Sequence, residues 1–73
     1  MNQEQKVYEY MQRFGSITTL EAFRDLAITR LSAKIFNLKK EGYSIVGDFE
    51  SSNNRFGEKV IYKRYFLKEE ANG

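Results

Sequence analysis

Apolar residues recur at helical intervals near the start of the chain. A first helix is predicted over about Gln3–Phe14, because apolar side chains there are spaced by three and four residues and share one face. The side chains of this stripe, all expected to point into the core, are Val7, Tyr10, Met11 and Phe14. Gly15 follows directly, and glycine commonly supplies the left-handed residue that ends a helix.

A second, shorter helix is predicted over about Thr19–Leu26. Thr18 and Glu21 have the spacing of a capping box, in which the hydroxyl accepts from the amide three residues on and the carboxylate reaches back. The preceding residues 16–18 are too few for a helix and rich in β-branched side chains, which predicts a brief extended segment. The side chains expected to point inward from this helix are Leu20, Phe23 and, as a further candidate, Ala27.

A third helix is predicted over about residues 30–41, with Thr29 as its N-cap. Gly42 ends this helix, and two lysines lie in its last turn, where the helix dipole favours cations. Its inward-facing apolar side chains are Leu31, Ile35 and Leu38. Together with the second helix and the short turn between them, it forms a helix-turn-helix unit.

Beyond the third helix the spacing changes to that of strands. An alternating run from Tyr43 to about Phe49 or Glu50 predicts one strand. Lys59–Leu67 is rich in Val, Ile, Tyr and Phe and predicts another. The polar residues 51–57 between them contain two asparagines and a glycine, which predicts the loop of a hairpin.

The pattern leaves the buried face of the second strand open. Tyr65 and Leu67 lie on one face, and Val60, Tyr62 and Phe66 lie on the other. Residues 1–68 are expected to form a single domain, and the polar residues 69–73 a disordered tail.

The order helix, short strand, helix, turn, helix and hairpin is the plan of a winged helix. Four segments, spanning nearly the whole chain, also resemble the small helix-turn-helix proteins common in bacteriophages and prophages. These segments are Gly15-Ser16-Ile17-Thr18-Thr19-Leu20-Glu21-Ala22, Ile28-Thr29-Arg30-Leu31-Ser32-Ala33-Lys34-Ile35, Leu38-Lys39-Lys40-Glu41-Gly42-Tyr43 and Lys63-Arg64-Tyr65-x-Leu67. The resemblance implies an α+β winged helix-turn-helix fold with three helices, a short strand and a C-terminal two-stranded β-hairpin wing.

The same resemblance implies binding of double-stranded DNA, in transcriptional or recombination control, in the cytoplasm of a bacterial host. One position departs from the family pattern, because relatives often carry glycine where this chain has Ala27. If the turn requires a positive φ there, alanine costs about 1 kcal/mol relative to glycine.

The distribution of charge favours a polyanionic partner. Residues 1–27 carry three basic and four acidic side chains, whereas residues 28–68 carry nine basic and four acidic ones. A basic second half beside a nearly neutral first half is typical of a surface that binds nucleic acid. A merely solvated, solubilising surface is the alternative.

The composition argues against catalysis. The chain has no histidine, which removes the commonest general base and metal ligand, and no cysteine, which removes thiolate sites and disulfides. Its carboxylates are scattered among basic residues, and no glycine-rich phosphate loop is present. We therefore expect no enzyme activity, cofactor, metal or small-molecule substrate. No apolar run approaches the roughly 20 residues of a membrane span, and no signal peptide is evident, so a cytoplasmic location is expected.

The predicted third helix carries the candidate DNA-binding residues. In a helix-turn-helix this helix enters the major groove. The residues on its outward side and flanks are Thr29, Arg30, Ser32, Ala33, Lys34, Asn37 and Lys40. Arg30 has the donors to read guanine and Asn37 those to read adenine, whereas Ser32 and Lys34 suit phosphates. Phe36 is expected to be half-buried against the first helix or the wing.

The hairpin adds Arg55 at its tip, where it is suited to a narrow minor groove, and Lys63 along its second strand, where it is suited to phosphates. A domain this small covers roughly 600–1,000 Å² of DNA, so a homodimer or a larger protein partner is also expected. Two alternatives remain open. In the first, the aromatic residues stack on single-stranded nucleic acid, although core packing explains them better. In the second, the hairpin aromatics Phe49, Phe56 and Tyr62 form a protein-binding edge.

Overall fold

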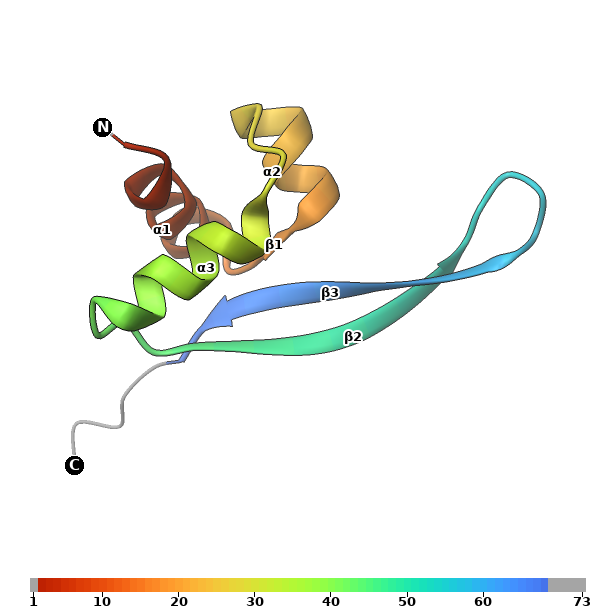
Figure 1. Cartoon of the computed structure of the whole chain (residues 1–73). Helices are drawn as coiled ribbons and strands as arrows, with labels where there is room; N and C mark the ends of the chain where they lie inside the picture. The colour runs from red at the N-terminus through yellow and green to blue at the C-terminus, as the bar shows by residue number, and fades with distance from the viewer. Residues whose placement is uncertain (1, 69–73) are drawn as a thin grey trace.

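The computed structural model describes residues 2–68, in which three helices precede a long hairpin (Figure 1). The elements are α1 (Gln3–Phe14), β1 (Ile17–Thr18), α2 (Thr19–Leu26), α3 (Leu31–Lys40), β2 (Ile45–Asn53) and β3 (Lys59–Leu67). The predicted order of elements is confirmed. Residues 69–73, for which a disordered tail is expected, lie outside the described residues.

Local capping fixes the bounds of the first two helices. The Asn2 side chain accepts a hydrogen bond of 2.8 Å from the Gln5 amide and caps α1, which ends at Gly15 with φ of 88°. The predicted capping box of α2 is present: the Glu21 amide donates to the Thr18 hydroxyl at 3.2 Å, and the Thr18 amide donates to the Glu21 carboxylate at 3.0 Å. These contacts are local in sequence, which is why both helices begin and end where the pattern predicts.

The N-terminus of α3 corrects one prediction. Thr29 is not its N-cap; Arg30 occupies that position, with no side-chain capping bond. The reason lies in the turn, where Ile28 is buried and its amide donates to the Ala22 carbonyl at 3.1 Å. This anchoring of Ile28 delays the helix, which begins at Leu31 and exposes Thr29 and Arg30 to solvent.

The core lies between the helices and the base of the hairpin. Its buried apolar residues are Val7, Met11, Ile17, Ala22, Ile28, Leu31, Ile35, Leu38 and Ile45. The predicted inward stripe of α3 is confirmed. Four other expectations are wrong, because Phe14, Leu20 and Phe23 are 68%, 69% and 58% exposed and Ala27 is exposed as well. Ala22, rather than its larger neighbours, is the buried residue of α2, and its small side chain lets the helix approach closely.

Ala27 adopts the left-handed conformation that its position demands, with φ of 56° and ψ of 32°. Replacing it with glycine is expected to raise the free energy of unfolding by about 0.5–1 kcal/mol. The relief of left-handed strain exceeds the extra entropy that glycine gives the unfolded chain. Thermal denaturation should show a melting temperature higher by several degrees. In the control Ala33→Gly, inside α3, the melting temperature should fall. A lower melting temperature for Ala27→Gly would contradict this account.

The three strands form an antiparallel sheet in the order β1-β3-β2. The hairpin pairs from Ile45↔Leu67 to Asn53↔Lys59, so β2 extends beyond its predicted end. Ser51 and Ser52, predicted to lie in the loop, are opposite Ile61 and Val60, whose β-branched side chains favour a strand. The ribbon therefore projects well beyond the helices (Figure 1).

The register also settles which face of β3 packs inward. Tyr65 and Leu67 pack against the core, together with Ile45 of β2. Paired residues in a sheet share a face, so Ile17 of β1, opposite Tyr65, belongs to the same layer. Of the alternative set, Val60 is 39% exposed.

Candidate nucleic-acid interface

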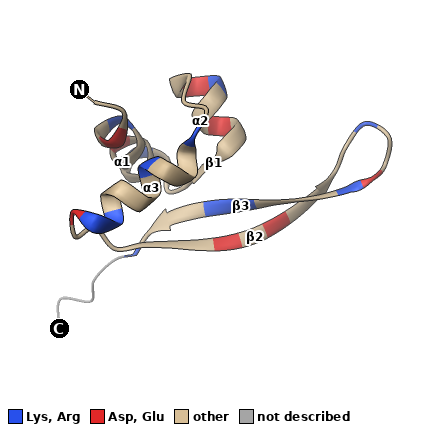
Figure 2. Ribbon diagram, in the orientation of Figure 1, with Lys and Arg blue, Asp and Glu red and all other residues tan. Residues whose placement is uncertain are grey.

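The exposed side of α3 is cationic. No Asp or Glu lies within this helix, whereas Lys34, Lys39 and Lys40 do, and Arg30 precedes it (Figure 2). Of the predicted site residues, Ala33 and Lys34 are half-buried, and the others in this region are exposed: Thr29, Arg30, Ser32, Asn37 and Lys40. Their backbone positions are fixed by the buried residues of the same helix, which hold α3 against the core.

One side of this surface is held by a carboxylate from α1. The Asn37 side-chain amide donates to Glu4 at 2.8 Å, and the Lys34 ammonium lies 3.9 Å from the same carboxylate. The hydrogen bond from Asn37, assisted by the charge of Lys34, holds the pKa of Glu4 below its ordinary value. Glu4 is therefore ionised at neutral pH, and it engages two of the side chains predicted to contact DNA.

Phe36 lies on the outward side of α3. The expectation that it is half-buried is wrong, because it is 61% exposed. The Lys40 ammonium lies 5.6 Å from the centre of its ring, within the range of a cation–π contact. The surface thus combines a flat apolar ring with a cation, beside the small side chain of Ala33.

The hairpin sorts its charges by face. We call the face that includes Ile45 and Leu67 the core-side face. Its basic residues are Lys59 and Lys63, and the strand residues on it include no acidic one. The opposite face carries Asp48, Glu50 and Arg64. Two neighbouring cations of β3, Lys63 and Arg64, therefore have different surroundings.

Lys63 lies across the core-side face. Its ammonium is 5.5 Å from the ring centres of both Phe49 and Tyr65. Gly47 makes this possible, because a Cβ atom there would collide with the Lys63 side chain. Aromatic rings hold the ammonium without neutralising its charge, so Lys63 remains able to attract a phosphate.

Arg64, by contrast, ties the hairpin to the helical part of the domain. It donates to Glu50 at 2.9 Å, to the Ser16 hydroxyl at 3.0 Å and to Glu21 at 3.3 Å. The hydrogen bond from Arg64 holds the pKa of Glu50 below its ordinary value. Because Glu21 also caps α2, a single guanidinium fixes the position of the wing relative to that helix.

The loop at the hairpin tip is organised by Asn54. Its side-chain oxygen accepts from the amides of Phe56 at 2.9 Å and Glu58 at 3.0 Å. Its backbone bonds to Glu58 and Gly57 at 2.9 and 3.0 Å, and Gly57 adopts a φ of 78°. These bonds hold Arg55, a predicted site residue, exposed at the tip.

The cations of residues 2–68 divide into paired and unpaired ones. Those that form ion pairs are Arg13, Arg24, Lys34 and Arg64. On α3, its N-cap and the hairpin, those that form none in this part of the chain are Arg30, Lys39, Lys40, Arg55, Lys59 and Lys63. Most of the unpaired charges within residues 2–68 thus belong to α3, its N-cap and the hairpin, and the others are Lys6 of α1 and Lys68.

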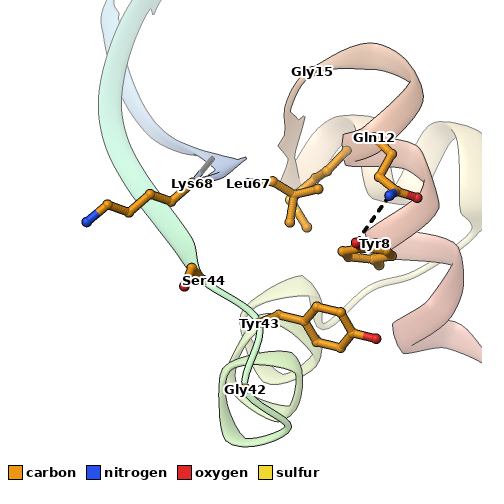
Figure 3. Close-up of a pocket in the computed structure, with 9 residues that line it drawn as sticks. Tyr8, Gln12, Gly15, Gly42, Tyr43, Ser44, Leu67 and Lys68 are labelled. Atoms are coloured by element: carbon orange, nitrogen blue, oxygen red, sulfur yellow. Dashed lines mark hydrogen bonds between the residues drawn. The ribbon is translucent and has the colours of Figure 1, made fainter. Parts of the chain in front are cut away.

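A hollow of about 590 Å³ lies elsewhere, between the C-terminal half of α1 and the start of the hairpin (Figure 3). The rings of Tyr8 and Tyr43 pack there at a tilt of 44° with their centres 4.5 Å apart, and Gln12 donates to the Tyr8 hydroxyl at 3.1 Å. Its described lining contains no carboxylate, and two of its polar side chains, Gln12 and Tyr8, bond to each other. The described residues also contain no acidic cluster able to hold a metal ion, and no helix long and apolar enough to cross a membrane.

A family model for the winged helix-turn-helix domain matches residues 2–70. The chain belongs to the winged helix-turn-helix domain family. Searches of curated proteins and of solved structures found no significant match. In winged-helix terms, α2 and α3 are the helix-turn-helix unit, and the β2–β3 hairpin is the wing. Membership supports DNA as the partner, because this domain is typically a DNA-binding one without enzyme activity.

The interpretation of the sequence missed several residues that shape the winged-helix surface. Glu4 gave no signal, because its partner Asn37 is 33 positions away. Arg64 carried no signal of its structural role, because its partners Ser16 and Glu21 are 48 and 43 positions away. Asn54 did carry a signal, since asparagine three residues before glycine favours a side-chain-to-backbone turn.

Proposed function

We propose that this winged helix is a non-catalytic module that binds double-stranded DNA, with α3 in the major groove and the wing on the backbone or minor groove. The observation that carries the proposal is the set of cations on α3, its N-cap and the wing that form no ion pair among residues 2–68. In addition, α3 itself contains no acidic residue. An unpaired surface cation gives up no ion pair when it meets a phosphate, so each contact adds to affinity.

The outward-facing residues of α3 and its N-cap suit different parts of the duplex. Arg30, at the N-terminal end, can present two donors to guanine, while Lys40 reaches a phosphate. Ala33 and the exposed Phe36 suit the methyl groups of thymine. Asn37 pairs with adenine only if it releases Glu4. Ser32, Lys34 and Thr29, with Lys63 of the wing, complete the proposed backbone contacts.

Fluorescence anisotropy with a labelled duplex of random sequence, at increasing salt, tests this function. If each unpaired cation of α3 and the wing neutralises one phosphate, the logarithm of the affinity should fall against that of salt with a slope of about −5. Absence of binding at tens of micromolar protein and low salt would contradict the proposal.

Glu4→Gln is expected to tighten binding by about threefold to tenfold at low salt. The substitution removes a negative charge from the edge of the DNA-binding surface and frees Lys34 to meet a phosphate. The salt slope should also steepen by up to about one. Glu9→Gln is the matched control, because Glu9 pairs with Arg13 within α1 and should leave affinity nearly unchanged. Weaker binding by Glu4→Gln would argue that Glu4 positions α3 rather than opposes DNA.

The alternative, a protein-binding edge on the hairpin, receives less support. Phe49 lies on the core-side face, Tyr62 on the opposite face and Phe56 at the tip. Residues so distributed do not make one contiguous apolar patch of the kind that marks protein interfaces.

The biological setting follows from the resemblance described above. We propose transcriptional or recombination control in a bacteriophage or prophage, in the cytoplasm of the bacterial host, as one domain over residues 1–68. A single domain of this size covers little DNA, so we also propose that it acts as a homodimer or beside a larger protein partner. Selection from a random duplex library tests this, because paired half-sites in the selected sequences report a dimer.

A further inference from the structure

Phe56 is the most exposed large apolar side chain of the described residues, at 87%. It stands at the tip of the hairpin, between Arg55 and Gly57. Such exposure is unfavourable in water, so the position is one where a partner that covers the ring gains affinity.

The tip that presents Phe56 is preformed. Its amide donates to the Asn54 side chain, the Asn54 amide donates back to the Glu58 carbonyl at 2.9 Å, and the Asn54 side chain donates to the Glu58 carboxylate at 3.2 Å. A loop held in one conformation loses little entropy when it binds. The backbone therefore holds Phe56 outward before any partner arrives.

The surroundings of Phe56 are polar. Arg55 precedes it, Lys59 begins the next strand, and neither forms an ion pair among residues 2–68. Glu58 is the one nearby acidic residue, and its carboxylate accepts from Asn54. A single ring bordered by cations does not resemble an apolar protein-binding patch. It does match the minor-groove chemistry in which arginine enters the groove and an apolar side chain wedges between bases.

The projecting part of the wing is long enough for this contact. Residues 49–53 of β2 continue past the pairs that pack on the core, and at about 3.3 Å per residue they extend about 16 Å before the loop begins. A major groove and the next minor groove are about 17 Å apart, half of a turn of about 34 Å. In Figure 1 the tip stands clear of all three helices.

We propose that Phe56 inserts between two base pairs in the minor groove next to the major groove occupied by α3, and so bends the duplex. Arg55 contacts the floor or backbone of the same groove. Pyrimidine–purine steps such as TA, which unstack most easily, are the preferred point of insertion. This inference rests on the DNA binding proposed above and adds deformation of the duplex to it.

The test uses the tightest duplex selected from a random library, carrying a donor and an acceptor fluorophore at its two ends. Anisotropy reports binding, and energy transfer between the ends reports bending. Wild-type protein should raise the transfer. Phe56→Ala should bind about tenfold more weakly and leave the transfer at its free-DNA value at saturation, whereas Phe56→Leu, still an apolar wedge, should retain most of the bend.

Ile61→Ala is the matched control, because Ile61 is 65% exposed on the same hairpin but lies outside the tip loop. It should bend the duplex as the wild type does. The inference is overturned if wild-type protein binds without raising the transfer, or if Phe56→Ala bends the duplex equally. If anisotropy shows no binding by wild-type protein, the proposed function fails together with this inference, so the two failures are distinguishable.

Discussion

Replacing Arg30 and Lys40 together with glutamate is expected to weaken binding to duplex DNA by at least about 100-fold at moderate salt. Both side chains are exposed at opposite ends of α3, and neither forms an ion pair within residues 2–68. Each substitution removes an attraction to phosphate or guanine and adds a repulsion from the DNA backbone. Fluorescence anisotropy across a range of salt concentrations measures the effect.

The control for this experiment carries the same change of charge on α1. Lys6→Glu combined with Arg13→Glu, like the α3 pair, removes four charge units in total, so both variants go from a net charge of +2 to −2. This control should bind within a few-fold of the wild type, because local contacts dominate over net charge at moderate salt. Equal losses in both variants would indicate that binding depends on overall charge and not on α3.

Arg64→Ala is expected to lower the free energy of unfolding by about 1–3 kcal/mol, which corresponds to a fall in melting temperature of roughly 5–15 °C for a domain of this size. The Arg64 side chain is only 22% exposed and bonds to Glu50, Ser16 and Glu21. Without the Arg64 guanidinium, the carboxylates of Glu50 and Glu21 lose the positive charge that both of them bond to. Thermal denaturation followed by circular dichroism measures the change.

Substitution of the neighbouring Lys63 should have the opposite balance of effects on stability and DNA binding. Lys63→Ala should change stability by no more than about 0.5 kcal/mol, because Lys63 lies on an exposed surface, but it should weaken DNA binding and reduce its salt slope. A melting temperature for Arg64→Ala within one degree or so of the wild type would show that the ion pairs do not hold the wing.

Lowering the pH should reduce the difference in melting temperature between Arg64→Ala and the wild type. Arg64 lowers the pKa of Glu50 in the folded protein, so this stabilisation is present above the ordinary glutamate pKa of about 4.3 and is lost as pH falls through the lowered value. Melting curves recorded at neutral pH and near pH 3 measure this convergence.

The sequence predicts the elements well and their packing less well, for a physical reason. Thr18 with Glu21, and Gly15, act on residues within a turn of themselves, so the bounds of α1 and α2 follow from local chemistry. Leu20 and Phe23 have helical spacing too, but spacing alone does not say which stripe meets a neighbour. The buried side of α2 depends on how closely α1 and α3 approach Ala22, which is a property of the folded chain.

The candidate site shows the same division. The exposed cations of α3 follow from the position of its apolar stripe, which the sequence contains. That Glu4 engages Asn37, and that Arg64 faces away from Lys63 to bind Ser16, depends on contacts between distant segments. These contacts separate cations that are available to DNA from cations that hold the fold.

The central claim, that α3 and the wing tip form one DNA-binding surface, is tested most directly by a two-dimensional ¹H–¹⁵N NMR titration with the selected duplex. The backbone amides of residues 29–40 and of the tip, Arg55 and Phe56 above all, are predicted to shift most. Those around Leu20 and Phe23, the exposed apolar side of α2, should stay in place. Shifts centred on α2, or unmoved amides in α3 at saturating DNA, would contradict the claim.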